Sequence, residues 1–159
     1  MELFLVFVFL LFTNFLLAAA EIALAAFGES KIEELKEKKD NYVNYFEKLN
    51  ENQEQVYSSI HLAFTFLTVI ISIIGYFIFS SWIYPQIMIL SDSSNFWATI
   101  VSIFITSVVI TIVILVFNVL VPKAIAYRYS DFIGKSSIKI ILLLSSLLKI
   151  ITGAVTALS

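Results

Sequence analysis

The side chains best suited to bind a cation lie inside three strongly apolar stretches of the chain. Glu21 is the only charged residue between Leu3 and Phe27. An ionised carboxylate at membrane depth is costly unless it faces water, a cation or another helix, so Glu21 marks a candidate functional site. The alternative is a protonated or hydrogen-bonded glutamate that joins two helices, and the sequence leaves both roles open.

Other oxygen and nitrogen donors accompany this carboxylate. Pro122 has no N–H to donate to the carbonyl of Asn118, so that carbonyl can accept a ligand, unless the proline simply ends its helix. His61, the only histidine, could bind a metal or relay a proton, and a hydrogen-bonded helix contact is its alternative role. Carboxylate, amide and carbonyl oxygens suit a cation such as Mg²⁺ or Na⁺. The predicted metal-site residues are Asn14, Glu21, His61, Thr65, Asn118 and Pro122.

Small and polar residues recur at helical spacing in each apolar stretch, which would place them on one face of a helix. Three such helices can pack with these faces inward, either around a hydrophilic cavity or through hydrogen bonds worth about 0.6 kcal/mol per pair. The glutamate, the histidine and the two asparagines favour the cavity. The first face holds Asn14, Ala18, Glu21 and Ala25; the second His61, Thr65, Thr68, Ser72 and Gly75 or Tyr76; the third Ser107, Thr111, Asn118 and Pro122.

The composition predicts an all-α integral membrane protein. Of the 159 residues, 60% are hydrophobic and only 14% are charged, whereas soluble domains carry about 25% charged residues. The chain has no cysteine, which excludes disulfides and thiolate chemistry. It also lacks a nucleophile–base motif, a glycine-rich phosphate loop and a basic nucleic-acid patch, so the sequence predicts neither an enzyme nor a nucleic-acid-binding protein.

The apolar runs predict three membrane spans, at residues 3–27, 56–82 and 96–121. Residues 29–54 carry most of the charge and predict two short amphipathic helices. The break is expected at residues 39–41, with Asp40 or Asn41 capping the second helix. Residues 130–158 predict a further helix. Lys149 near its middle would be costly in a fourth crossing, so this helix is expected to lie at the membrane interface, although a crossing is the alternative.

The basic residues predict the orientation of these spans. Every lysine and arginine lies either between Glu29 and Glu54 or after the third span, which is one side of the membrane if there are three crossings. The positive-inside rule makes that side cytoplasmic and places the N-terminus outside. The Ser80–Asn95 loop would then be external, with an aromatic belt beside it. The belt residues are Trp82, Tyr84 and Trp97.

Four motifs in this order resemble the transmembrane domain of the CorC/CNNM (cyclin-M, hemolysin-C-like) magnesium transporters. The run NFLLAAAEIAL from Asn14 resembles the family's N-x-F-F-A-A-S/A-E-x-A-L. KIEEL from Lys31 resembles S-R-I-E-E-L, and SIHLAFT from Ser59 resembles x-I-Q-L-G-I-T. LVPKAIA from Leu120 resembles the end of G-E-L-V-P-K-x-L-A. The similarity covers nearly the whole chain.

The resemblance implies a homodimer with three transmembrane helices per subunit, cytoplasmic belt helices and an external N-terminus. It implies a dehydrated Mg²⁺ held between the three helices by oxygen groups. Family members usually continue into nucleotide-binding CBS modules, which this chain does not contain. Asn118 and Val119 stand where the family has Gly-Glu, and this loses a carboxylate that would help to dehydrate Mg²⁺. Other family positions are changed to Ala20, His61 and Ala63.

These observations predict a cation transport domain in the bacterial inner membrane. The expected activity is Mg²⁺ efflux or exchange, with Na⁺ as the candidate coupling ion and membrane lipid as the surroundings. Two alternatives remain open at this stage. One is transport of a different cation such as an organic amine, and the other is a non-transporting membrane scaffold or accessory subunit with the same fold.

Overall fold

Seven α-helices and one π-helical segment make up the part of the chain that the structure describes. This computed structural model describes residues 1–90 and 95–156. The all-α fold class is confirmed, and three helices are long and apolar enough to cross a membrane. The elements are α1 (Glu2–Ala25), α2 (Glu29–Glu37), α3 (Val43–Glu51), α4 (Gln53–Leu90), α5 (Asn95–Ile114), the π-helical segment η1 (Leu115–Leu120), α6 (Val121–Arg128) and α7 (Ser130–Thr156).

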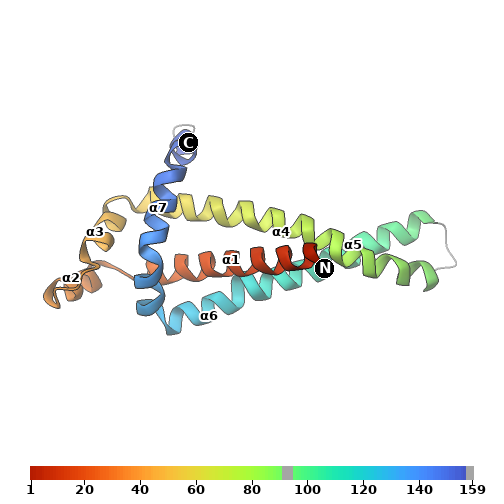
Figure 1. The fold of residues 1–159 in the computed structure, drawn as a ribbon, viewed down its shortest axis with the longest axis horizontal. Helices are drawn as coiled ribbons and strands as arrows, with labels where there is room; N and C mark the ends of the chain where they lie inside the picture. The colour runs from red at the N-terminus through yellow and green to blue at the C-terminus, as the bar shows by residue number, and fades with distance from the viewer. Residues whose placement is uncertain (91–94, 157–159) are drawn as a thin grey trace.

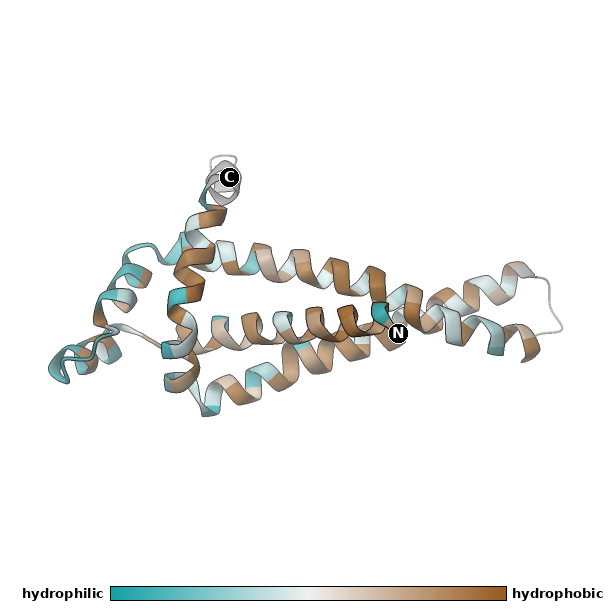
Figure 2. Ribbon diagram, in the orientation of Figure 1, coloured by the Kyte–Doolittle hydropathy of each residue, from teal (hydrophilic) through white to brown (hydrophobic). Residues whose placement is uncertain are grey.

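The long helices lie along one axis, and the short ones gather at one end (Figure 1). α5, η1 and α6 follow one another without a break and together form the third long helix. α4 packs against α5, whereas α1 packs against both α4 and α6. The long helices are predominantly apolar, while α2 and α3 are the most hydrophilic part (Figure 2). The basic residues therefore gather at the end that carries α2, α3 and α7, as the orientation argument requires.

α1 and α4 run antiparallel (Figure 1), and three pairs of residues, seven apart on each helix, lie near one another across them. Seven residues are close to two helical turns, so contacts at this interval keep one face of each helix against the other. This seam joins the first two polar faces expected from the sequence. The matched pairs are Phe7 with Gly75, Asn14 with Thr68, and Glu21 with His61.

Two helices extend past their predicted ends. α4 continues through Pro85 to Leu90, so much of the expected Ser80–Asn95 loop is helical. The residues after Trp82 remain mostly apolar, and a proline inside a helix removes one hydrogen bond without necessarily ending it. The third long helix likewise continues beyond residue 121 to Arg128.

The short helices confirm a break between residues 37 and 43. The prediction that Asp40 or Asn41 caps the second helix is wrong, because the N-cap of α3 is Tyr42 and no side chain caps that helix. Asp40 instead accepts a hydrogen bond from the Tyr42 backbone N–H at 3.0 Å, inside the turn. Lys39 adopts a positive φ of 51° at the same turn.

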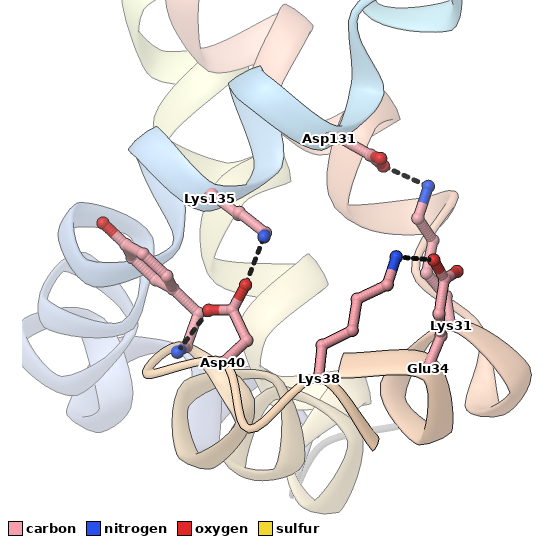
Figure 3. A network of polar contacts seen from close by, with 7 residues as sticks. Lys31, Glu34, Lys38, Asp40, Asp131 and Lys135 are labelled. Atoms are coloured by element: carbon pink, nitrogen blue, oxygen red, sulfur yellow. Dashed lines mark hydrogen bonds and ion pairs between the residues drawn. The ribbon is translucent and has the colours of Figure 1, made fainter. Parts of the chain in front are cut away.

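α7 runs across the ends of α1 and α4 (Figure 1). It is tied to the α2–α3 region by two ion pairs, Lys31–Asp131 and Lys135–Asp40 (Figure 3). The hydrogen bond from Lys135, followed by that from the Tyr42 backbone, lowers the pKa of Asp40. The membrane-surface position of residues 130–158 stays a prediction, and residues 157 and 158 lie outside the described residues.

Candidate cation site in the three-helix junction

Asn14 is fully buried on α1 with one of its two amide atoms unpaired. Its Nδ2 donates a hydrogen bond to Thr68 Oγ1 at 2.9 Å, and the Thr68 hydroxyl donates to the Phe64 carbonyl at 2.8 Å. These bonds fix the direction of the amide. The Asn14 Oδ1 atom has no hydrogen-bond partner, which is unusual for a buried polar atom and calls for a ligand, a water or a conformational role.

Asn118 is the second buried asparagine, with 1% of its surface exposed. It lies in the π-helical segment η1. Neither its Oδ1 nor its Nδ2 has a hydrogen-bond partner. A buried amide left without partners destabilises the fold by about 1–3 kcal/mol. Packing alone does not explain why a polar side chain lies at this position.

The packing register places these two asparagines at one level. Phe7 and Ile110 meet beside Gly75, and Ala126 packs with Ala19 and Ala23. α1 and the third long helix run in the same direction (Figure 1). Counting from either contact along both helices puts Asn118 opposite residues 11 to 15 of α1. Thr68 from α4 therefore joins the same level, so all three long helices contribute a polar side chain there.

Pro122 follows the π-helical segment and does not end the helix. The N–H of Val121 bonds the carbonyl of Val116, five residues back. The same pattern would join residue 122 to the carbonyl of Phe117, but proline has no N–H to donate. The i to i−5 pattern would free the Phe117 carbonyl and an α-helical pattern the Asn118 carbonyl, so the donor missing at Pro122 removes the usual partner of one of these two. Isolated π-helical turns within α-helices are frequent at functional sites.

Glu21, His61 and Thr65 lie together in a separate groove between α1 and α4. Its volume is about 890 Å³, and Asn14, Asn118 and Pro122 do not line it. The six predicted residues thus form two groups. Asn14, Asn118 and Pro122 are fully buried in the junction, while Glu21 is half-buried and His61 and Thr65 are exposed along the groove.

The third polar face divides in a similar way. Ser107 and Thr111 are exposed and line a smaller groove of about 460 Å³ between α4 and α5 with Ser72. The buried polar residues of α5 are instead Ser102 and Thr106, which the sequence analysis missed. The available signal was their four-residue spacing, which continues in the structure through buried Ile110, half-buried Ile114, and buried Asn118, Pro122 and Ala126.

The buried level supplies neutral oxygen atoms only. Amide oxygens and a freed carbonyl are hard ligands that suit Na⁺, Ca²⁺ or Mg²⁺. Among the residues that the structure describes, no group of three or more His, Cys, Asp and Glu side chains could hold a metal ion. A cation at this level would therefore keep part of its charge uncompensated, or would keep some of its water.

A family model for the cyclin M (CNNM) transmembrane N-terminal domain matches residues 5–159. The chain belongs to the CNNM family. This confirms the resemblance drawn from the motifs around Glu21 and Pro122. The CNNM family is a family of membrane transporters for divalent cations and is not typically enzymatic. No curated protein matches the chain.

Proposed function

We propose that this CNNM domain transports Mg²⁺ across the membrane by efflux or exchange, with Na⁺ as the coupling ion. The cation would pause at the level of Asn14 and Asn118, between the three long helices. The observation that carries the proposal is the pair of fully buried asparagines at this level, whose free amide atoms have no partner within the protein.

The surroundings of these amides support a transient site. The cation would meet the Asn14 and Asn118 oxygens and the carbonyl before Pro122, and all of these are neutral. A neutral site binds a divalent cation weakly, which suits release on either side of the membrane. Glu21 lies two turns nearer the end with the basic residues, about 10 Å along the helix, where a carboxylate would attract cations toward the junction.

The assembly and the location belong to the proposal as well. We expect a homodimer in the bacterial inner membrane with the N-terminus outside and with α2, α3 and α7 on the cytoplasmic side. The gathering of basic residues at that end supports this orientation, since lysine and arginine are enriched on the cytoplasmic side of membrane proteins.

Reconstituted proteoliposomes with an internal Mg²⁺-sensitive dye test the proposal. Asn118→Leu keeps a side chain of similar size and removes the amide, so Mg²⁺ flux should fall to the level of empty liposomes. Glu21→Ala should reduce flux as well. Thr111→Val is the matched control on the same long helix, because Thr111 is exposed and its hydroxyl bonds its own helix at Ser107. This control should leave flux unchanged.

Three results would contradict the proposal in different ways. Equal flux in Asn118→Leu and the parent would refute the site. Flux of an organic amine without any Mg²⁺ flux would show that the transported cation is the amine and not Mg²⁺. A parent protein that moves no cation and binds none would refute transport and favour a membrane scaffold of the same fold.

A further inference from the structure

The groove between α1 and α4 contains the only carboxylate within the first apolar stretch, at a place distinct from the buried asparagines. Glu21 forms one side of the groove, and the other lining residues come from α4. The polar lining groups besides Glu21 include His61 and Thr65, the apolar lining groups include Leu62 and Phe66, and Tyr57 adds an aromatic ring with a hydroxyl. Deep burial does not explain this glutamate, because it is only half-buried.

The contents of the groove fit Mg²⁺ poorly. Mg²⁺ requires near-octahedral oxygen ligands and gives up its water reluctantly. This groove offers one carboxylate, one imidazole, two small hydroxyls and the phenol hydroxyl of Tyr57 among apolar side chains. In the part of the chain that the structure describes, no three His, Cys, Asp or Glu side chains are placed to hold a metal ion together.

The same contents fit an organic cation well. A carboxylate at the edge of an apolar surface pairs with an ammonium group, while aromatic rings attract the cation and its carbon substituents. Phe66 is 65% exposed and Tyr57 is half-exposed, so both rings remain available to a ligand. A volume of about 890 Å³ lies within the range of small-molecule pockets, which are mostly apolar with a few polar groups.

We propose that the α1–α4 groove binds an organic ammonium ion with an apolar body, held by the Glu21 carboxylate and the rings of Tyr57 and Phe66. This goes beyond the proposed Mg²⁺ transport, because the groove and the asparagine level are separate sites. The groove opens along the side of α4, so the ammonium group could belong either to a soluble amine or to the headgroup of a lipid such as phosphatidylethanolamine.

Binding of ethidium, a fluorescent quaternary ammonium ion, tests this site in the purified full chain. Fluorescence anisotropy in a detergent with an uncharged headgroup gives the dissociation constant. Glu21→Gln keeps the shape of the side chain and removes its charge, so ethidium should bind at least about tenfold more weakly, which corresponds to about 1.4 kcal/mol. Thr111→Val changes a residue of the other groove and should alter the dissociation constant less than about threefold.

Two further measurements separate this site from the asparagine level and identify the source of the ligand. Asn118→Leu should leave ethidium binding unchanged even where it abolishes Mg²⁺ flux. Equal binding by Glu21→Gln and the parent would overturn the proposal, as would equal losses in Glu21→Gln and Asn118→Leu. In phosphatidylglycerol vesicles, weaker ethidium binding after addition of phosphatidylethanolamine would assign the groove to the lipid headgroup, and unchanged binding would assign it to soluble amines.

Discussion

Replacing Gly134 by alanine is expected to disturb the contact between α7 and the end of α1. A Cβ atom at this position would lie 2.4 Å from Cε2 of Phe27, about 1 Å closer than ordinary contact. Phe27 cannot move aside easily, because its ring is buried and stacks on Phe46 with 4.1 Å between ring centroids. The glycine therefore allows α7 to lie directly against this aromatic pair.

Two opposing effects set the size of the change. Alanine in a helix interior is more favourable than glycine by about 1 kcal/mol. Overpacking of a well-filled contact costs about 1–3 kcal/mol, and the short distance to a fixed ring places Gly134→Ala near the upper limit. The net loss of stability is therefore about 2 kcal/mol, which corresponds to a melting temperature lower by about 4–8 °C in a protein of this size.

Gly75→Ala is the matched comparison, since it also places a Cβ against a phenylalanine ring. The Cβ there would lie 3.0 Å from Cε2 of Phe7, so the steric cost is smaller and the gain in helix propensity offsets it. Circular dichroism at 222 nm during heating in one detergent measures both variants. Gly134→Ala should melt below the parent, and Gly75→Ala should melt close to it.

A double variant that removes the Phe27 ring tests whether this ring causes the loss of stability in Gly134→Ala. Phe27→Leu removes the ring and lowers stability by itself, but adding Gly134→Ala to it should cost little more, because neighbouring substitutions are not additive. A Gly134→Ala protein that melts at or above the parent temperature would refute the packing argument. Fully additive losses in the double variant would refute the role of Phe27.

Three further changes test other parts of the molecule. Asp40→Asn should lower the melting temperature at neutral pH, because Lys135 holds the Asp40 pKa below its ordinary value. A carboxyl group with a lowered pKa stabilises the fold at pH values above its ordinary pKa. The difference in melting temperature from the parent should therefore vanish as the pH falls through the lowered pKa of Asp40. Thr68→Val should cost about 1 kcal/mol by leaving the Asn14 Nδ2 atom unpaired, measured by the same melting curves, and should slow Mg²⁺ flux. Pro122→Ala restores a backbone donor and should raise the melting temperature while reducing flux, and a rise in flux would contradict the role of the freed carbonyl.

The motifs around Glu21 and Pro122 were sufficient to identify the family. The apolar runs were sufficient to predict the three long helices. The short helices and the break between them were likewise predictable, because amphipathic periodicity and turn preferences are local properties. The ends of α4 and of the third long helix could not be predicted from the sequence, because both helices continue through or past a proline. Whether a proline ends a helix depends on what surrounds it rather than on the residue alone.

The arrangement of the candidate site was harder to predict from the sequence than the helices. The spacing correctly placed Asn14 and Glu21 on one face of α1, and that face does meet α4 through Thr68 and His61. It could not show that Asn14 would be sealed in the junction while Glu21 remained at a groove. The spacing also placed Asn118 on the same face as Ser107 and Thr111, although Asn118 is buried and the other two are exposed. A π-helical segment, which the spacing could not predict, changes which residues share a face.

The sequence by itself thus determined the class, the family and the helical faces that carry polar groups. Only the tertiary structure decided which of those groups are buried together. α4 and α5 lie against each other near the start of α1, but α4 and α6 contact different sides of α1 farther along (Figure 1). Burial at each level depends on how many neighbouring helices are present there, and this arrangement is a property of all the helices together.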